Sequence, residues 1–190
     1  MITESSATAE LIGGLEALAT LAPERAVRKA VPLLTRLTDG AAFLAEHVVP
    51  LFREATDADE WYVARRWEGE GDSCSLEIFV WPAGSGTLIH DHTSWGVFRC
   101  VVGTILEKRY ERLDDGSCFE HARLKKAWQL AWGPEDGIST VLPGNGGIHR
   151  VENPSGSTAI SVHLYGPRLG EVDGRDYDPS REYVCDRRPA

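Results

Sequence analysis

The sequence has few cysteines, and none of them are close together. Cys74, Cys100, Cys118 and Cys185 are the only four, and no two of them form a CxxC pair. A zinc knuckle or a redox-active dithiol needs closely spaced cysteines, so the spacing argues against both. We expect free thiols, as in a protein from a reducing compartment.

Positive charge is also scarce. The chain carries 20 Lys and Arg against 29 Asp and Glu, which gives a formal net charge of −9 at pH 7. Proteins that bind nucleic acids neutralise phosphates with clustered Lys and Arg, so this composition argues against such a partner.

Long apolar runs are missing as well. No stretch of about 18 apolar residues occurs, and a membrane-spanning helix needs about that length. The first residues, MITESSATAE, are polar and acidic, whereas a secretion signal begins with a basic segment and continues with an apolar one. We therefore expect a cytoplasmic protein without a membrane partner.

The composition that remains is ordinary for a globular chain. Of the 190 residues, 42% are hydrophobic and 26% are charged, which suits one domain with a packed core. Apolar residues at helical spacing predict helices over 9–22, 24–39 and 41–55, and Pro32 predicts a kink or a break in the second. We expect residues 1–58 to form a helical segment packed on a barrel of residues 59–190, within a single domain.

From about Trp61 onward the pattern changes to short apolar or alternating stretches separated by Gly, Pro, Asn and Asp. Such stretches are typical of strands, and many short strands indicate a mainly β sandwich or barrel. The last polar segment, 170–190, is expected to be irregular. The predicted strands fall within 74–82, 87–103, 105–113, 139–143, 149–154 and 159–166.

Two histidines stand one residue apart in the second of these strands. Side chains alternate across a strand, so His90 and His92 share a face while Asp91 points away and has a structural role. Two imidazoles on one face can chelate a metal ion. A His-x-His pair by itself is a weak signal, because exposed histidines without a role are common.

The surroundings of this pair strengthen the interpretation. The first segment runs Gly84, five residues, His90-Asp91-His92, three residues, Gly96, six residues, Gly103. The second runs Gly137, five residues, Pro143, two residues, Gly146, two residues, His149, three residues, Asn153. Together they resemble the two motifs of the cupin superfamily.

This resemblance implies a double-stranded β-helix, a jelly-roll barrel, that holds a metal ion with His90, His92 and His149. The Glu that cupins usually carry in the first motif is absent, and Gly96 stands at its place. Three neutral imidazoles would leave the whole metal charge uncompensated and so favour an anionic ligand such as a thiolate. The alternative is that the three histidines are ordinary hydrogen-bonded core residues.

A second polar pattern lies on the strand 159–166. Ser161, His163 and Tyr165 alternate with apolar residues and therefore share one face. If that face lines the barrel, the three side chains form a hydrogen-bonded chain from hydroxyl to imidazole to phenol. An exposed polar strand face is the alternative, since half-buried strands alternate in the same way.

A three-His cupin with a Ser-x-His-x-Tyr strand resembles the thiol dioxygenases, namely cysteine dioxygenase and 3-mercaptopropionate dioxygenase, over about residues 40–178. The resemblance implies a non-haem Fe(II) enzyme that adds O₂ to a small carboxylated thiol and gives the sulfinate. It also implies that the three histidines of the cupin motifs hold the iron and that Ser161, His163 and Tyr165 form a catalytic relay. We expect a monomer or a weak homo-oligomer.

The same resemblance bears on Tyr165. In animal cysteine dioxygenases a Cys at the position of Gly96 is cross-linked to the active-site Tyr, so Tyr165 is expected to be unmodified here. Cys100, four residues later and on the same face of a regular strand, is left as an alternative partner. Trp81 and Trp95 either line the pocket or pack in the core.

A substrate carboxylate calls for an Arg, which can grip it with two hydrogen bonds. Ala64 stands where cysteine dioxygenase has its Arg, which favours a 3-mercaptopropionate-like acid over cysteine. Arg65, Arg168 and Arg175 are the candidate substrate-binding residues, and an ordinary surface role is the alternative for each.

Two other functions stay open at the level of sequence. The protein is either another cupin metalloenzyme that acts on a non-thiol substrate, or a metal-bound cupin that binds or senses a ligand without turnover.

Overall fold

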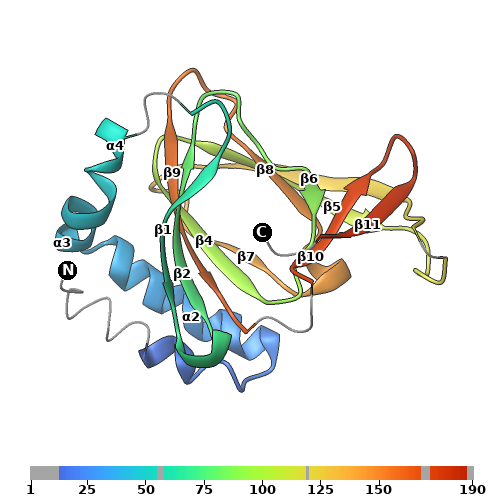
Figure 1. Cartoon of the computed structure of the whole chain (residues 1–190), viewed down its shortest axis with the longest axis horizontal. Coiled ribbons are helices and arrows are strands. Elements are labelled where there is room, and N and C mark those ends of the chain that lie inside the picture. The colour runs from blue at the N-terminus through green and yellow to red at the C-terminus, as the bar shows by residue number, and fades with distance from the viewer. Residues whose placement is uncertain (1–12, 55–57, 119, 168–171, 188–190) are drawn as a thin grey trace.

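Two antiparallel sheets and a set of N-terminal helices make up the fold (Figure 1). The computed structural model describes residues 13–54, 58–118, 120–167 and 172–187. The helices lie on the outer side of one sheet, and the second sheet stands on its other side. The predicted fold class, mainly β with N-terminal helices, is confirmed.

The first sheet carries the helices and has the order β1-β2-β9-β4-β7. Most of its neighbouring strands are far apart in sequence, so the sheet brings the two motif-bearing segments of the chain together. Its strands are β1 (Tyr62–Glu68), β2 (Ser75–Trp81), β9 (Ala159–Tyr165), β4 (Gly96–Val102) and β7 (Ser139–Val141).

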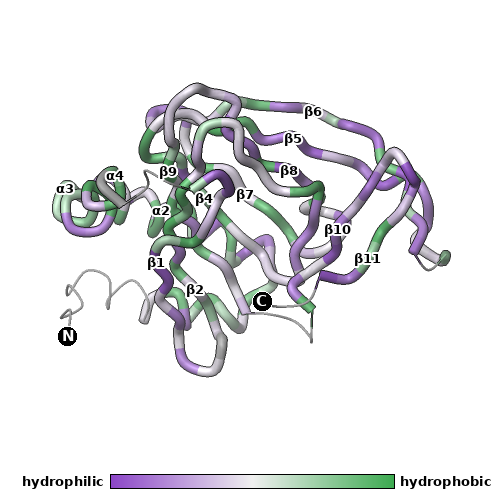
Figure 2. The backbone as a smooth tube through the Cα atoms, turned by 45° about the horizontal axis from the view of Figure 1, so that its top comes forward, coloured by the Kyte–Doolittle hydropathy of each residue, from purple (hydrophilic) through white to green (hydrophobic). Residues whose placement is uncertain are grey.

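The second sheet has the order β11-β10-β3-β8-β5-β6. Hydrophilic residues recur along β5 and β6 (Figure 2), and β6 was not among the predicted strands. Its strands are β11 (Tyr183–Arg187), β10 (Gly174–Asp178), β3 (Ile89–His90), β8 (His149–Glu152), β5 (Ile105–Arg112) and β6 (Leu124–Trp132).

The helical part is shorter and more broken than the pattern predicts. Residues 13–16 are helical and lead into a turn, whereas 9–12 lie outside the described residues. The predicted helix 41–55 is divided into α3 (Ala41–Phe43), a π-helix (Leu44–Val48) and α4 (Leu51–Glu54), and its residue 55 is not described. Two 3₁₀ turns complete the set, Glu70–Asp72 and Gly144–Gly147. None of the helices in the described ranges is long and apolar enough to cross a membrane.

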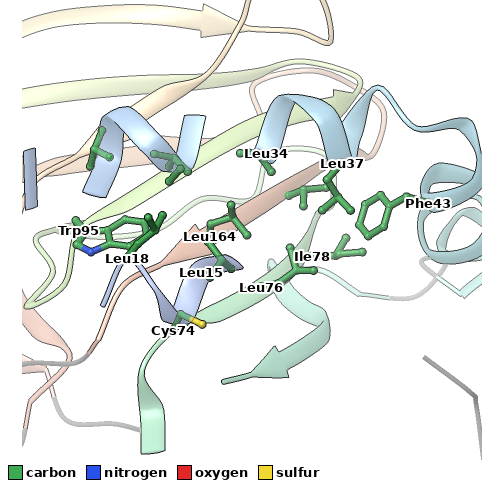
Figure 3. Packing of buried hydrophobic residues seen from close by; sticks show 14 of the residues in the cluster. Leu15, Leu18, Leu34, Leu37, Phe43, Cys74, Leu76, Ile78, Trp95 and Leu164 are labelled. Carbon is green, nitrogen blue, oxygen red and sulfur yellow. The ribbon is translucent and has the colours of Figure 1, made fainter. Parts of the chain in front are cut away.

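The helix α2 (Pro23–Thr38) runs through Pro32 without a break, so the predicted break is wrong. A proline removes one backbone hydrogen bond and costs roughly 3 kcal/mol in a helix interior. Burial of the apolar face of α2 against the first sheet offsets this cost, and Leu34 and Leu37 lie over Leu164 of β9 (Figure 3).

Alternation along β2 and β9 decides what faces the helices and what faces the barrel interior. Leu76, Ile78 and Val80 of β2 belong to the core beneath α2. The intervening side chains of β2, such as Phe79, line an internal cavity together with His163 of β9. The same period of two therefore builds the core beneath the helices on one face and the wall of the cavity on the other.

The prediction that the segment 170–190 is irregular is wrong for its described part, 172–187. β10 and β11 form a hairpin, and β10 pairs with β3 through Asp176 opposite His90. Several of the charges that suggested a loop have partners in the folded chain. Arg175 donates from Nε to the carboxylate of Asp91 at 2.8 Å, and the Tyr177 hydroxyl donates to the same carboxylate at 2.8 Å.

Asp91 is the centre of this attachment, as expected for a structural residue. Its side chain is 1% exposed, and it also accepts a hydrogen bond from the backbone N–H of Arg175 at 2.6 Å. The carboxylate points to the opposite side of β3 from His90. It therefore ties the last strands of the chain to the short strand that begins the histidine cluster.

We expect Asp91→Asn to lower the free energy of unfolding by about 2 kcal/mol, because an amide leaves the Arg175 charge without its partner. Urea unfolding of the metal-free protein measures the change. Asp115→Asn, in an exposed turn where the carboxylate caps Ser117, is the control and should change it by less than about 0.5 kcal/mol. Equal midpoints for the two variants would contradict the role given to Asp91.

Candidate active site

Three imidazoles converge between the two sheets. His90 of β3 stands directly opposite His149 of β8, and His92 follows two residues after His90, where the chain bends before β4. One ligand nitrogen from each ring lies within 4.8 Å of the others. The predicted continuous strand over 87–103 is wrong, because β3 ends at His90, but the two histidines still face the same cavity.

Hydrogen bonds decide which nitrogen of each ring faces the site. His90 Nδ1 lies 3.0 Å from the carbonyl oxygen of Leu88, and His149 Nδ1 lies 2.8 Å from a carboxylate oxygen of Glu107. Carbonyl and carboxylate oxygens only accept, so both Nδ1 atoms carry the hydrogen and both Nε2 atoms keep a lone pair. His92 Nε2 lies 3.1 Å from His149 Nε2, so the nitrogen atoms of the rings gather at one place.

Burial keeps these rings uncharged. It lowers the pKa of His90 to about 4 and lowers the pKa values of His92 and His149 well below the usual value, with the positive charge of Arg187 acting in the same direction. Neutral imidazole is the form that binds a metal ion. The donor set therefore fits a divalent metal that accepts nitrogen ligands, such as Fe, Zn, Cu or Ni.

Glu107 of β5 is the acceptor that orients His149. Its side chain is fully buried, and it is balanced by Arg109 Nε at 2.7 Å and by donors from Ser139 Oγ at 2.6 Å and Trp132 Nε1 at 3.0 Å. Nothing in the charged stretch around Glu107 identifies it as this acceptor. The one sign in the sequence is the alternation of side chains along the strand, because Glu107 lies two residues after the buried Ile105 and so shares its face.

Ser161, His163 and Tyr165 form the predicted hydrogen-bonded chain. Ser161 Oγ lies 2.6 Å from His163 Nε2, and His163 Nδ1 lies 3.0 Å from the Tyr165 hydroxyl. Ser161 is fully buried and His163 is 4% exposed, which excludes the exposed-face alternative. Burial lowers the pKa of His163 to about 3 and raises the pKa of Tyr165, so both are neutral at pH 7.

Gly96 lies directly opposite Tyr165 across β4 and β9. A Cβ atom at Gly96 would stand 2.9 Å from the tyrosine ring, closer than real contacts allow, so the ring occupies the space that a side chain there would need. Cys100 lies opposite Ser161 instead, and its thiol donates to the carbonyl of Val102 at 3.2 Å. All four cysteines are free thiols.

The three imidazoles, together with His163 and Tyr165 of the relay, line one cavity of about 720 Å³. Trp81 lines it and stacks on Phe79, with ring centroids 5.7 Å apart. Trp95 does not line it but packs in the core beneath the helices (Figure 3). Pocket lining and core packing were the alternatives for both tryptophans at the level of sequence, and the structure shows one of each.

The predicted substrate arginines lie elsewhere or outside the described residues. Arg65 donates to the carbonyl of Ala64, Arg175 is held by Asp91, and neither is among the residues that line the cavity. Arg168 lies in the segment 168–171, outside the described residues. A substrate role for these three stays a prediction.

Two arginines that the sequence reasoning missed do line the cavity, Arg66 of β1 and Arg187 of β11. Arg66 Nε lies 3.2 Å from Glu77, and Arg187 Nη1 lies 3.0 Å from Asp176. The residue pattern of β1 does not reveal that Arg66 faces the cavity. The register shifts between Val63 and Arg65, and such a bulge changes which side chains face inward.

Comparisons with known proteins found similar solved structures and a matching family. Solved structures similar to the chain include a Cupin 2 conserved barrel domain protein from Salinispora arenicola (13% identity, 56% of this chain and 73% of the other, TM-score 0.39). The Cnp3 cupin domain of Schizosaccharomyces pombe (14%, 54% and 59%, 0.40) and a recombinant oxalate oxidase in complex with glycolate (14%, 60% and 54%, 0.45) are also similar. The sequence profile for cysteine dioxygenase type I matches residues 34–179. The chain therefore belongs to the cysteine dioxygenase type I family.

Proposed function

We propose that the protein is a non-haem Fe(II) thiol dioxygenase that converts a small carboxylated thiol, 3-mercaptopropionate-like or cysteine, to its sulfinate. The observation that carries the proposal is the meeting of two groups in one cavity. His90, His92 and His149 present neutral nitrogens, and the chain that ends in Tyr165 opens beside them.

The reaction balances without another reductant. The thiolate and O₂ give the sulfinate, so the O–O bond breaks, two S–O bonds form, sulfur loses four electrons and O₂ gains four. Fe(II), held by the three histidines, would supply the redox chemistry that this needs. Because all three protein ligands are neutral, they leave the positive charge of the ion to attract a thiolate.

Tyr165 is the residue that we assign to the reacting atoms. Its ring lies 5.4 Å from that of His92, measured between centroids, and its neutral hydroxyl can donate a hydrogen bond to the substrate or to oxygen. His163 holds the hydroxyl in place at 3.0 Å, and Ser161 holds His163.

We assign the substrate carboxylate to the two cavity-lining arginines, with Arg66 as the direct contact. Glu77 lies beside the Nε atom of Arg66. The Nη1 atom of Arg66 is 3.8 Å from Glu68, which is longer than a hydrogen bond, so this end of the guanidinium can bind a carboxylate. Arg187 carries contacts to the carbonyl oxygens of Asp91 and Asp173, so it contributes positive potential from a fixed position.

Oxygen consumption tests the proposed function. Protein loaded with Fe(II) under anaerobic conditions should consume O₂ only after a thiol is added, with one O₂ used for each sulfinate formed. An oxygen electrode and mass spectrometry of the product, with cysteine, 3-mercaptopropionate, mercaptosuccinate and cysteamine as substrates, measure both quantities.

Two variants separate the alternatives. Tyr165→Phe should reduce turnover at least about 100-fold but leave thiol binding in place, because it removes a hydroxyl and keeps the ring. His92→Ala should lose both metal and turnover. Absence of O₂ uptake with every thiol would overturn the proposal, and an unchanged rate in Tyr165→Phe would overturn the role of the relay.

We expect Glu107→Gln to weaken Fe(II) binding by about 10- to 100-fold. The neutral amide cannot balance the charge of Arg109. Its N–H₂ group also cannot accept the hydrogen bonds that the wild-type carboxylate accepts from its neighbours. Competition with a chelator under anaerobic conditions measures the affinity. Glu152→Gln is the matched control, since Glu152 pairs with Lys108 and Arg150 outside the histidine cluster. An equal affinity in the Glu107 and Glu152 variants would contradict the orienting role.

The neighbouring arginines of β1 give a second matched pair. Arg66→Met should raise KM for 3-mercaptopropionate about tenfold or more, because an ion-paired hydrogen bond to the carboxylate is lost, and should leave KM for the carboxylate-free cysteamine unchanged. Arg65→Met should change neither value. Steady-state O₂ uptake measures both constants, and a rise of KM in Arg65→Met alone would assign the carboxylate to Arg65 instead.

A further inference from the structure

The hydroxyl of Ser161 has a partner on each side. Trp81 Nε1 lies 2.8 Å from Ser161 Oγ, and His163 Nε2 lies 2.6 Å from the same atom. Trp81 is 1% exposed and Ser161 is fully buried. The chain of hydrogen bonds is therefore one residue longer than the sequence pattern indicates, and it begins at an indole.

An indole N–H can only donate, so Ser161 must accept from Trp81. The hydroxyl hydrogen of Ser161 then needs an acceptor of its own. Within the described ranges His163 Nε2 is the one acceptor in reach of it. His163 Nε2 thus carries the lone pair, Nδ1 carries the hydrogen, and this hydrogen is donated to the Tyr165 oxygen at 3.0 Å.

The hydrogen of the Tyr165 hydroxyl is then left to point elsewhere, and Tyr165 lines the cavity. We propose that Trp81 is a positioning residue that sets the direction of the whole chain, so that Tyr165 offers a hydrogen, and not a lone pair, to the reacting atoms. The consequence for catalysis rests on the proposed function, whereas the direction itself is a property of the folded protein.

The opposite direction shows why the indole matters. Tyr165 would donate to His163 Nδ1, and Nε2–H would donate to Ser161. Ser161 would then accept two hydrogen bonds, one from His163 and one from Trp81, and its own hydrogen would be buried without an acceptor. That is the costly case for a buried hydroxyl. Without the indole N–H, Ser161 can turn, and the two directions become closer in free energy.

Trp81 is held firmly enough to act in this way. Its ring stacks on Trp61, with centroids 5.8 Å apart, as well as on Phe79. The Asn153 side chain donates to the Trp81 carbonyl at 2.8 Å. Trp95 offers a matched comparison, because it is 2% exposed and its Nε1 has no hydrogen-bond partner among the described residues.

The tautomer of His163 tests the proposal. Long-range ¹H–¹⁵N spectra of the protein loaded with Zn(II), a diamagnetic ion, should show His163 protonated at Nδ1. Trp81→Phe should lower the ratio of Nδ1–H to Nε2–H by about tenfold, and Trp95→Phe should leave it unchanged. In the Fe(II) protein, Trp81→Phe should lower kcat by about fivefold or more, with less than about a twofold change in KM.

Three results would overturn the proposal: a wild-type His163 protonated at Nε2, an unchanged tautomer in Trp81→Phe, or a Ser161→Ala variant that keeps the full Nδ1–H preference. The first and third decide the question even if Trp81→Phe does not fold. A wild-type protein that shows the expected tautomer but consumes no O₂ with any thiol would overturn the proposed function and leave the direction of the chain intact.

Discussion

The interior of the barrel depends on keeping four buried imidazoles neutral. Burial in a medium of low polarity disfavours the charged ring, so each histidine has one N–H and one lone pair, and its hydrogen-bond partner decides which nitrogen has which. The Leu88 carbonyl does this for His90, Glu107 for His149, and Ser161 for His163. Glu107 is itself a buried charge, and it is tolerable because Arg109, Ser139 and Trp132 surround it. Removing one partner would leave another unpaired, which makes the network a single unit.

This requirement explains why distant parts of the chain meet at the site. The three candidate ligands come from β3, from the bend after it and from β8. The acceptor for His90 is the Leu88 carbonyl just before β3, and the acceptor for His149 is Glu107 of β5, which Ser139 of β7 holds in turn. The short strand β3 could not hold a fixed position alone. It is pinned on one side by pairing with β8 and on the other by β10, whose Arg175 and Tyr177 bind Asp91. The final hairpin therefore helps to position the histidine cluster, because it binds Asp91, the residue between His90 and His92.

The sequence was sufficient for features that depend on local spacing. The three candidate ligands, the relay on β9 and the fold class follow from short motifs and a period of two. It was insufficient where a role depends on pairing between distant residues. Glu107 has the appearance of a surface charge until its three hydrogen-bond donors and the ion-paired Arg109 are brought to it. The C-terminal hairpin seemed irregular because its charges are neutralised only in the folded chain. The inward orientation of Arg66 depends on a bulge, which changes the face on which the following side chains lie and cannot be recognised in the residue pattern.

The same logic bears on how the cavity would treat a substrate with two anionic ends. The histidines are neutral and contribute no net charge, so the sulfur end depends on the metal, and the carboxylate end depends on arginines. Arg109 pairs with Glu107 and Arg175 with Asp91, and neither lines the cavity. Arg66 and Arg187 also have acidic partners, but both line the cavity, and they are therefore the arginines that we propose for the carboxylate. Because Arg66 comes from the bulged strand β1 and Arg187 from the final hairpin, the proposed choice of thiol would depend on pairing that the residue pattern does not reveal.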